Sequence, residues 1–244
     1  MSLNDMNWKN IESLRSMIAE SKHPNIAVAA QAFVEAFVST FPTIVLARMF
    51  LVLPFQALPD IERDFARTFA GRDARLASST RVLALLGSAG HEATYQGRLR
   101  SMGHLAIPLL DRSFVQNIPM IAKLLADLDV DLVALDEGRP IATRQMLGGK
   151  NTTFFVPDAV SARDAQLRPI IPAREFVQSH GIRTVFGMGG SYFDGTLAVT
   201  VLFTQEDVSR ATADRFASFI STFKTTTSSL LQRGAVYTAE GFLQ

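Results

Sequence analysis

The sequence contains no cysteine, and this absence removes several chemistries at once. Without thiols the chain forms no disulfide, thiolate nucleophile, zinc–thiolate site or cysteine-bound iron–sulfur cluster. Histidine is also scarce: the four histidines are scattered, with no pair three or four residues apart and no histidine–glutamate metal motif. The sequence therefore gives no indication of a metal site.

Net charge and long apolar runs are lacking as well. Lysine and arginine total 24 against 23 acidic residues, a formal net charge of +1, so no overall field favours nucleic acid. The longest apolar run, Ile44 to Phe55, is interrupted by Arg48 and is shorter than the roughly 20 residues of a membrane span. The first residues lack the basic and apolar segments of a secretory signal. We expect a cytoplasmic protein that binds neither nucleic acid nor membrane.

The usual nucleotide and acyl-transfer motifs are missing. The glycine-rich stretch 187–190 lies inside an expected strand, where glycine permits a bulge or the close approach of another backbone or a ligand, and residues 147–151 lack the spacing of a phosphate loop. Neither Ser88 nor Ser191 has the two flanking glycines of a nucleophile elbow. No catalytic constellation is visible.

The 244 residues are 48% hydrophobic, enough for a substantial core. Apolar residues at three- and four-residue steps predict helices from Asp5 to Glu20 and from Asn25 to Pro42, and a final helix from Ser209 that can extend to Leu231. Shorter helices are predicted near 60–70, from Ser113 to Leu128, and from Pro172 to His180. The pattern of residues 130–150 is weak.

Strands are predicted between these helices. They cover Thr43 to Phe55, Thr80 to Leu86, His104 to Leu110, Phe154 to Val156, Thr184 to Tyr192 and Thr196 to Phe203. The last two flank Phe193-Asp194-Gly195, where Asp-Gly favours a hairpin with a tight primed turn. No internal repeat or low-complexity linker is present, so the simplest division is an N-terminal helix (1–24), one domain (25–231) and a flexible tail (232–244).

The order of elements carries a resemblance. Residues 182–187, the Asp-Gly hairpin, residues 197–203 and the closing amphipathic helix together resemble the end of a GAF domain. The likeness of architecture extends over 25–231. Residues 103–109 and 171–177 are similar to stretches of sensory modules attached to bacterial histidine kinases and cyclases. The resemblance implies an α/β (α+β) fold with a central antiparallel sheet flanked by helices, plus the N-terminal helical extension.

A GAF-like fold implies a small-molecule site between the sheet and the loops and short helices that cover one face. The polar connection of residues 91–104 can contribute to it, or can equally be a solvated loop with surface ion pairs. The candidate ligand-binding residues are Tyr95, Arg98, Arg100, His104, Phe155, Phe186, Met188 and Tyr192. The sequence identifies neither the small molecule nor any cofactor.

Three functions remain open at this stage. The first is a non-catalytic small-molecule sensor of bacterial type that signals through its terminal helices to a partner in trans, such as a histidine kinase or a cyclase. The second is a ligand-free dimerisation module, since the apolar stripes of residues 8–18 and 216–231 can pack in a two-fold homodimer or only cover the sheet of a monomer. The third is an enzyme with His91 or His104 as general base; the methionine-sulfoxide reductases with this fold need cysteines, and none exists here.

Overall fold

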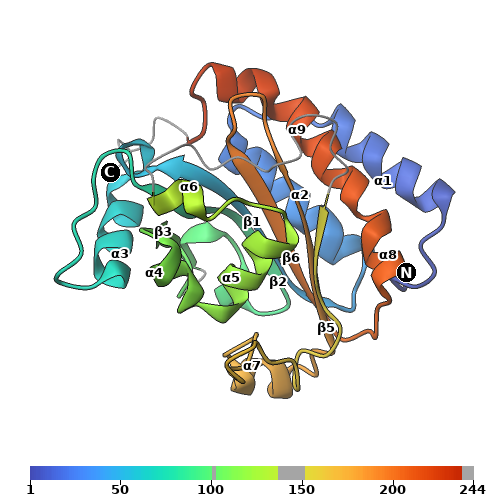
Figure 1. Ribbon diagram of the computed structural model, residues 1–244. Coiled ribbons are helices and arrows are strands. Elements are labelled where there is room, and N and C mark those ends of the chain that lie inside the picture. Colours follow the sequence, from blue (N-terminus) through green and yellow to red (C-terminus); the bar gives the residue numbers. More distant parts are fainter. Residues whose placement is uncertain (101–102, 137–151, 238–244) are drawn as a thin grey trace.

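Six strands form one antiparallel sheet in the computed structural model, which describes residues 1–100, 103–136 and 152–237 (Figure 1). The strand order is β3-β2-β1-β6-β5-β4. The strands are β1 (Ile44–Pro54), β2 (Arg81–Gly90), β3 (Ala106–Leu109), β4 (Thr152–Val156), β5 (Thr184–Ser191) and β6 (Leu197–Thr204). The predicted antiparallel sheet is confirmed, and the β5–β6 hairpin lies within it.

Helices cover both faces of the sheet (Figure 1). One face is covered by α1 (Trp8–Glu20), α2 (Ile26–Thr40) and α9 (Ala217–Gln232), with α8 (Arg210–Arg215) beside β4. The other side of the molecule carries α3 (Asp60–Ala70), α4 (Arg112–Gln116), α5 (Pro119–Asp127), α6 (Val133–Asp136) and α7 (Arg174–Ser179), and the 3-10 turns η1 (Phe55–Ala57), η2 (Ala93–Tyr95) and η3 (Arg98–Arg100). Among the described residues, no helix is long and apolar enough to cross a bilayer.

Strand β1 is buried on both faces, which explains its continuous apolar run. Met49 and Leu51 join the core under α2 and α9, whereas Phe50 and Val52 join the core on the opposite face. Because side chains alternate along a strand, Arg48 lies on the same face as Phe50. The one charge in the run is therefore directed towards the layer of short helices.

Helix α2 sits very close to β2. A Cβ atom on Gly87 would lie 2.5 Å from the carbonyl oxygen of Ala30, so only glycine fits there. Strand β3 pairs with β2 as far as Ala84. Further along β2, the Gln31 side-chain amide of α2 binds the Ser88 backbone: its Oε1 accepts from the Ser88 N–H and its Nε2 donates to the Ser88 carbonyl. These contacts fix α2 to the sheet.

Two local predictions differ from the structure. The helix predicted from Ser113 is divided into α4 and α5, because Pro119 has no N–H to continue a helix and instead begins the second one. The cap of α4 is Asp111, whose carboxylate accepts from the Phe114 N–H at 2.7 Å. The hairpin has the predicted loop Phe193-Asp194-Gly195, closed by Tyr192 and Thr196, but positive φ occurs only at Gly195, so the turn is not the primed type that Asp-Gly favours.

The terminal segments are packed against the domain. The apolar stripe of α1 (Ile11, Leu14 and Ile18) and that of α9 are buried within this one chain, although Trp8 and Met17 remain exposed. Following α9, the carbonyls of Ala235 and Val236 accept hydrogen bonds from the Ile26 and Ala27 N–H groups at the start of α2. The chain is thus hydrogen-bonded to α2 as far as Val236. The flexibility of the tail from residue 232 stays a prediction, and residues 238–244 lie outside the described part.

The outer edge of β4 is partly occupied by side chains. The Asp127 carboxylate accepts from the Phe155 N–H at 3.1 Å and also pairs with Lys123. On the same strand, the Thr153 hydroxyl donates to Asp214 of α8. The Phe155 N–H, a backbone donor that a neighbouring strand could otherwise use, is therefore engaged within the chain.

Candidate functional site

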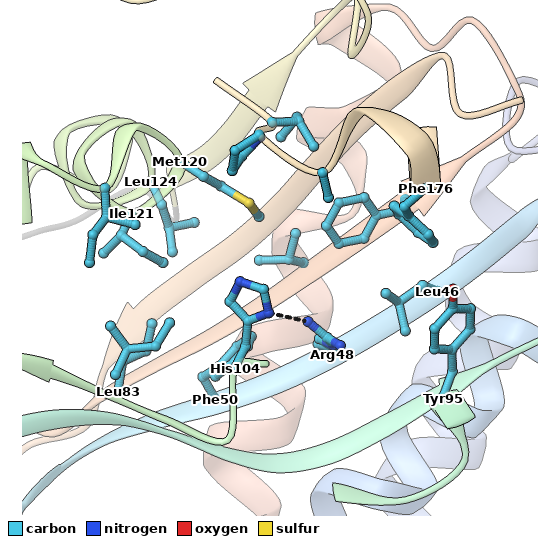
Figure 2. Close-up of a pocket in the computed structure, with 17 residues that line it drawn as sticks. Leu46, Arg48, Phe50, Leu83, Tyr95, His104, Met120, Ile121, Leu124 and Phe176 are labelled. Carbon is cyan, nitrogen blue, oxygen red and sulfur yellow. Dashed lines mark hydrogen bonds between the residues drawn. The ribbon is translucent and has the colours of Figure 1, made fainter. Parts of the chain in front are cut away.

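A cavity of about 250 Å³ lies between the centre of the sheet and the short helices α5 and α7 (Figure 2). Its walls are almost entirely apolar. The sheet contributes Leu46, Phe50, Leu83, Ile107, Val201 and Phe203, and the covering layer contributes Ile118, Met120, Ile121, Leu124, Ile171 and Phe176. Pro172 and Ala173, at the start of α7, are exposed and line the cavity at its rim.

Three side chains bring polar groups to this cavity: Arg48, His104 and Tyr95. Arg48 projects from the middle of β1, and its Nη1 lies 3.1 Å from Nδ1 of His104 (Figure 2). A guanidinium only donates hydrogen bonds, so Nδ1 accepts and the neutral imidazole carries its proton on Nε2. In Figure 2 this second nitrogen is turned away from Arg48, towards Met120.

Desolvation sets the charges of the pair. It lowers the pKa of Arg48 to about 10, so the guanidinium remains protonated at neutral pH. His104 is exposed at the rim of the cavity, and partial desolvation there, together with the positive charge of Arg48, lowers the pKa of its imidazole below the ordinary 6.5, so the ring is neutral at neutral pH. The pair therefore places a positive charge and a neutral hydrogen-bonding ring beside a partly open, apolar cavity.

Tyr95 connects the rim of the cavity to α7. Its ring meets that of Phe176 edge to face at 5.8 Å, and Phe176 in turn packs against Phe203 at 5.5 Å. Burial raises the pKa of the Tyr95 hydroxyl, as does the nearby Glu92 carboxylate. This aromatic row packs Tyr95, and with it the turn η2, against α7.

The structure brings only two of the candidate ligand-binding residues, Tyr95 and His104, to the cavity. Arg98 forms an ion pair with the buried Glu62 of α3, and its guanidinium lies 5.0 Å above the Tyr237 ring. Arg100 is exposed and is not part of the lining. Within the polar connection, Tyr95 and His104 therefore line the cavity, whereas Arg98 contacts the C-terminal segment.

The other four candidates are placed elsewhere because of strand alternation. Phe186 and Met188 point into the core under α2 and α9, with Phe186 against Phe216 at 5.2 Å. The Tyr192 hydroxyl is 2.7 Å from that of Thr227 on α9. Phe155 lies beneath the Arg210 guanidinium at 5.7 Å and borders a different groove, alongside α5. Their neighbours Val185 and Phe154 occupy the cavity-side core instead.

Sequence reasoning missed Arg48 as a site residue. Its signal was the single charge inside the run from Ile44 to Phe55, since a buried charge in a strand needs a purpose or a partner. His91, the other histidine considered as a base, is exposed and does not line the cavity. Within 1–100, 103–136 and 152–237 no group of three metal-ligating side chains is found.

The overall architecture is similar to that of GAF domains. The GAF domain of a phosphoenolpyruvate-protein phosphotransferase from Coxiella burnetii matches with a TM-score of 0.52 at 11% identity, covering 95% of this chain and 100% of that one. The fold is therefore GAF-like, as the sequence resemblance implied.

Two more distant solved structures have lower scores. The phycoerythrobilin-bound GAF domain of a cyanobacterial phytochrome has a TM-score of 0.48 at 11% identity, with 94% and 98% of the two chains covered. The free methionine-R-sulfoxide reductase of Neisseria meningitidis has a TM-score of 0.47 at 11% identity, with 91% and 89% covered. No protein-family model matches the sequence, and no curated protein matches it.

Proposed function

We propose that this protein is a non-catalytic sensory domain that binds a small molecule in the cavity between the sheet and helices α5 and α7. The observation that carries the proposal is the partly open, apolar, 250 Å³ cavity with a few polar groups at its wall. Such a combination is the usual form of a ligand site in a globular protein. A ligand buried there contacts the sheet and its covering layer together, so it can favour one arrangement of the two.

The chemistry of His104 supports binding rather than catalysis. A general base is most effective when its pKa lies near the working pH, whereas a histidine with a pKa of about 4 accepts a proton weakly. Its Nδ1 is also engaged with Arg48. The proposal therefore assigns His104 a recognition role and assigns no reaction to the cavity.

The contact of Arg98 with Tyr237 supports an output through the C-terminal part of the chain. Arg98 belongs to the same segment as Tyr95 and His104, which line the cavity. Tyr237 follows the residues that hydrogen-bond to the start of α2. We propose that ligand binding acts through this contact on α2 and α9, and so on a partner in trans such as a histidine kinase or a cyclase.

The binding proposal is tested by a thermal-shift screen of small apolar compounds that are neutral, anionic and cationic. The wild-type protein is compared with Ala173→Phe, which fills the rim of the cavity at an exposed position, and with Ala77→Phe, which adds the same ring at an exposed position away from it. A ligand at 100 times its Kd adds about 2.7 kcal/mol to the free energy of unfolding. Compounds that bind should raise the Tm of the wild type and Ala77→Phe but not of Ala173→Phe.

Two outcomes would contradict the sensory proposal. One is the failure of every class of compound to stabilise the wild-type protein. The other is an equal response of Ala173→Phe, which would place the binding elsewhere.

A further inference from the structure

The segment that covers one end of the cavity is attached to the rest of the chain mainly through side chains. Residues 172–181, which include α7, lie between two buried residues, Ile171 and Ile182. Among the described residues, the backbone of this segment hydrogen-bonds within 172–182 and belongs to no strand of the sheet. Figure 1 shows α7 at the margin of the molecule, apart from the other helices. Such a segment can move without disturbing the sheet.

Both ends of the segment have residues suited to a change in backbone direction. Gly181, between α7 and β5, has a φ of 61°, which glycine adopts without strain. At the other end, Pro172 has no N–H that movement would leave without an acceptor. Moving segments turn at a few loop positions of this kind, at the ends of elements.

Two apolar side chains hold the segment against the cavity. Phe176 lines the cavity and packs edge to face on Tyr95 of η2 and on Phe203 of β6. Val177 is buried in the core on the same side of the sheet. An outward movement of α7 would expose these two side chains and leave the strand pairing intact. Their burial therefore favours the closed arrangement.

A contact outside the cavity fixes the far end of α7. His180 directly follows α7, and its Nε2 lies 2.6 Å from Oε1 of Glu92. The His180 carbonyl also accepts from the Gln205 side-chain amide at 2.9 Å. Because Glu92 stands immediately before η2, its carboxylate joins α7 to the turn that carries Tyr95. The Glu92 side chain is about half exposed, so this contact can form and break in solvent without unfolding the domain.

We propose that residues 172–181 form a lid over the cavity and that the Glu92–His180 contact is its latch. Opening of the lid widens the passage at the rim, where Pro172 and Ala173 are exposed, and gives access to the apolar walls. The inference rests on the proposed sensory function for the purpose of the lid, since it names how access to that same site is regulated. Its test uses no ligand, so the lid and the sensory function can fail separately.

The absence of cysteine from the chain allows a test by thiol labelling. Val201→Cys places one thiol in the wall of the cavity, and Val34→Cys places one in the core under α2. Each protein is treated with the neutral reagent monobromobimane, and the labelling rate is followed by fluorescence. We expect Glu92→Ala to raise the rate at Val201→Cys about two- to fivefold, the range typical of an exposed ion pair, and to leave the rate at Val34→Cys unchanged.

Glu175→Ala is the matched control, because it removes an exposed carboxylate from α7 itself and leaves the latch intact. It should change neither rate. Three results would each overturn the lid: no acceleration at Val201→Cys by Glu92→Ala, an equal acceleration at Val34→Cys, or labelling of Val201→Cys as fast as that of N-acetylcysteine. The sensory proposal would still stand if compounds stabilise the protein in the thermal-shift screen. If labelling is as expected and no compound stabilises the protein, the lid stands and the sensory proposal fails.

Discussion

At the scale of single residues, the Arg48–His104 pair shows how desolvation, with a neighbouring charge, keeps an imidazole neutral. The two side chains share a hydrogen bond in an apolar cavity, and the fixed charge of Arg48 opposes a second charge on the imidazole. This lowered pKa also affects the stability of the protein, because His104 binds a proton more readily in the unfolded chain than in the folded one.

The pH dependence of stability follows from this competition. Folding lowers the pKa of His104 from an ordinary 6.5 to about 4, so the unfolded chain binds the proton more readily than the folded one. The contribution of His104 is therefore complete above pH 6.5 and is lost as the pH falls towards 4. Lowering the pH from 7 to 5 should therefore lower the free energy of unfolding, by an amount that solvent screening of the exposed imidazole reduces.

The measurement is chemical denaturation of the wild type and His104→Gln at pH 7 and pH 5. The drop in the free energy of unfolding should be smaller in His104→Gln than in the wild type, while His91→Gln, a change at a histidine that does not line the cavity, should behave as the wild type. Parallel pH profiles for all three proteins would show that His104 titrates normally in the folded state.

Glu62 is a second residue whose effect depends on its surroundings. It is fully buried on α3 and forms an ion pair with Arg98, whereas Asp64 on the same helix pairs with Arg67 at the surface. Removing one member of a buried pair leaves the other charge without compensation. We expect Glu62→Gln to lower the free energy of unfolding by about 3 kcal/mol.

The matched control is Asp64→Asn, for which a change within about 0.5 kcal/mol is expected because exposed pairs contribute little. Both values come from chemical denaturation at one pH. Similar small losses for the two variants would mean that the Glu62–Arg98 pair does not hold α3 and η3 together.

At the scale of elements, the seating of α2 on β2 depends on the missing side chain of Gly87. A methyl group there would press on the backbone carbonyl of Ala30, which cannot rotate away as a side chain would. We expect Gly87→Ala to lower the free energy of unfolding by about 1–3 kcal/mol, measured by chemical denaturation.

Ser88→Ala is the informative neighbour for comparison. The Ser88 hydroxyl is buried without a hydrogen-bond partner within the described residues, so its removal should be neutral or slightly stabilising. If Ser88→Ala lowers the free energy of unfolding as much as Gly87→Ala does, then any substitution in this part of β2 is destabilising, and the close contact of Gly87 with α2 is not the cause.

The elements were largely predictable from the sequence, whereas the side of the sheet that each residue faces was not. The run from Ile44 and the Asp194-Gly195 turn signal identified the two central strands, because burial and turn chemistry are local properties. Phe186 and Met188 were assigned to the pocket although they face α2 and α9. Both faces of β5 are apolar, so the alternation carried no information about which one is open.

The arginines illustrate the same limit. Arg98 lies in a polar segment and resembled a ligand-binding residue, but it contacts Glu62 and Tyr237. Arg48 lies in an apolar strand and has the contacts of a recognition residue. The difference arises from long-range packing, which no local pattern records.

At the scale of the whole molecule, the C-terminal segment links the cavity to the helical face. We expect a saturating concentration of a compound that raises the Tm in the thermal-shift screen to slow hydrogen exchange of the Ile26 and Ala27 amides several-fold, because their acceptors lie next to Tyr237. Tyr237→Leu removes the ring under Arg98, so the ligand should still bind within about twofold of the wild-type Kd but should no longer slow these amides.

Tyr237→Phe keeps the ring and serves as the control, since it should behave as the wild type. Bound ligand that leaves the two amides unchanged in the wild-type protein would show that the C-terminal segment does not report on the cavity. The readout is the exchange rate at individual amides with and without ligand.

The carboxylate of Asp127 affects the tendency of the protein to aggregate through the edge of its sheet. By occupying the Phe155 N–H, it removes a donor through which a strand of another molecule could extend the sheet. Replacing Asp127 with alanine would open that position, and concentrated solutions of the variant should form β-rich aggregates sooner than those of the wild type. A single acidic side chain on a helix thus helps to keep this sheet finite.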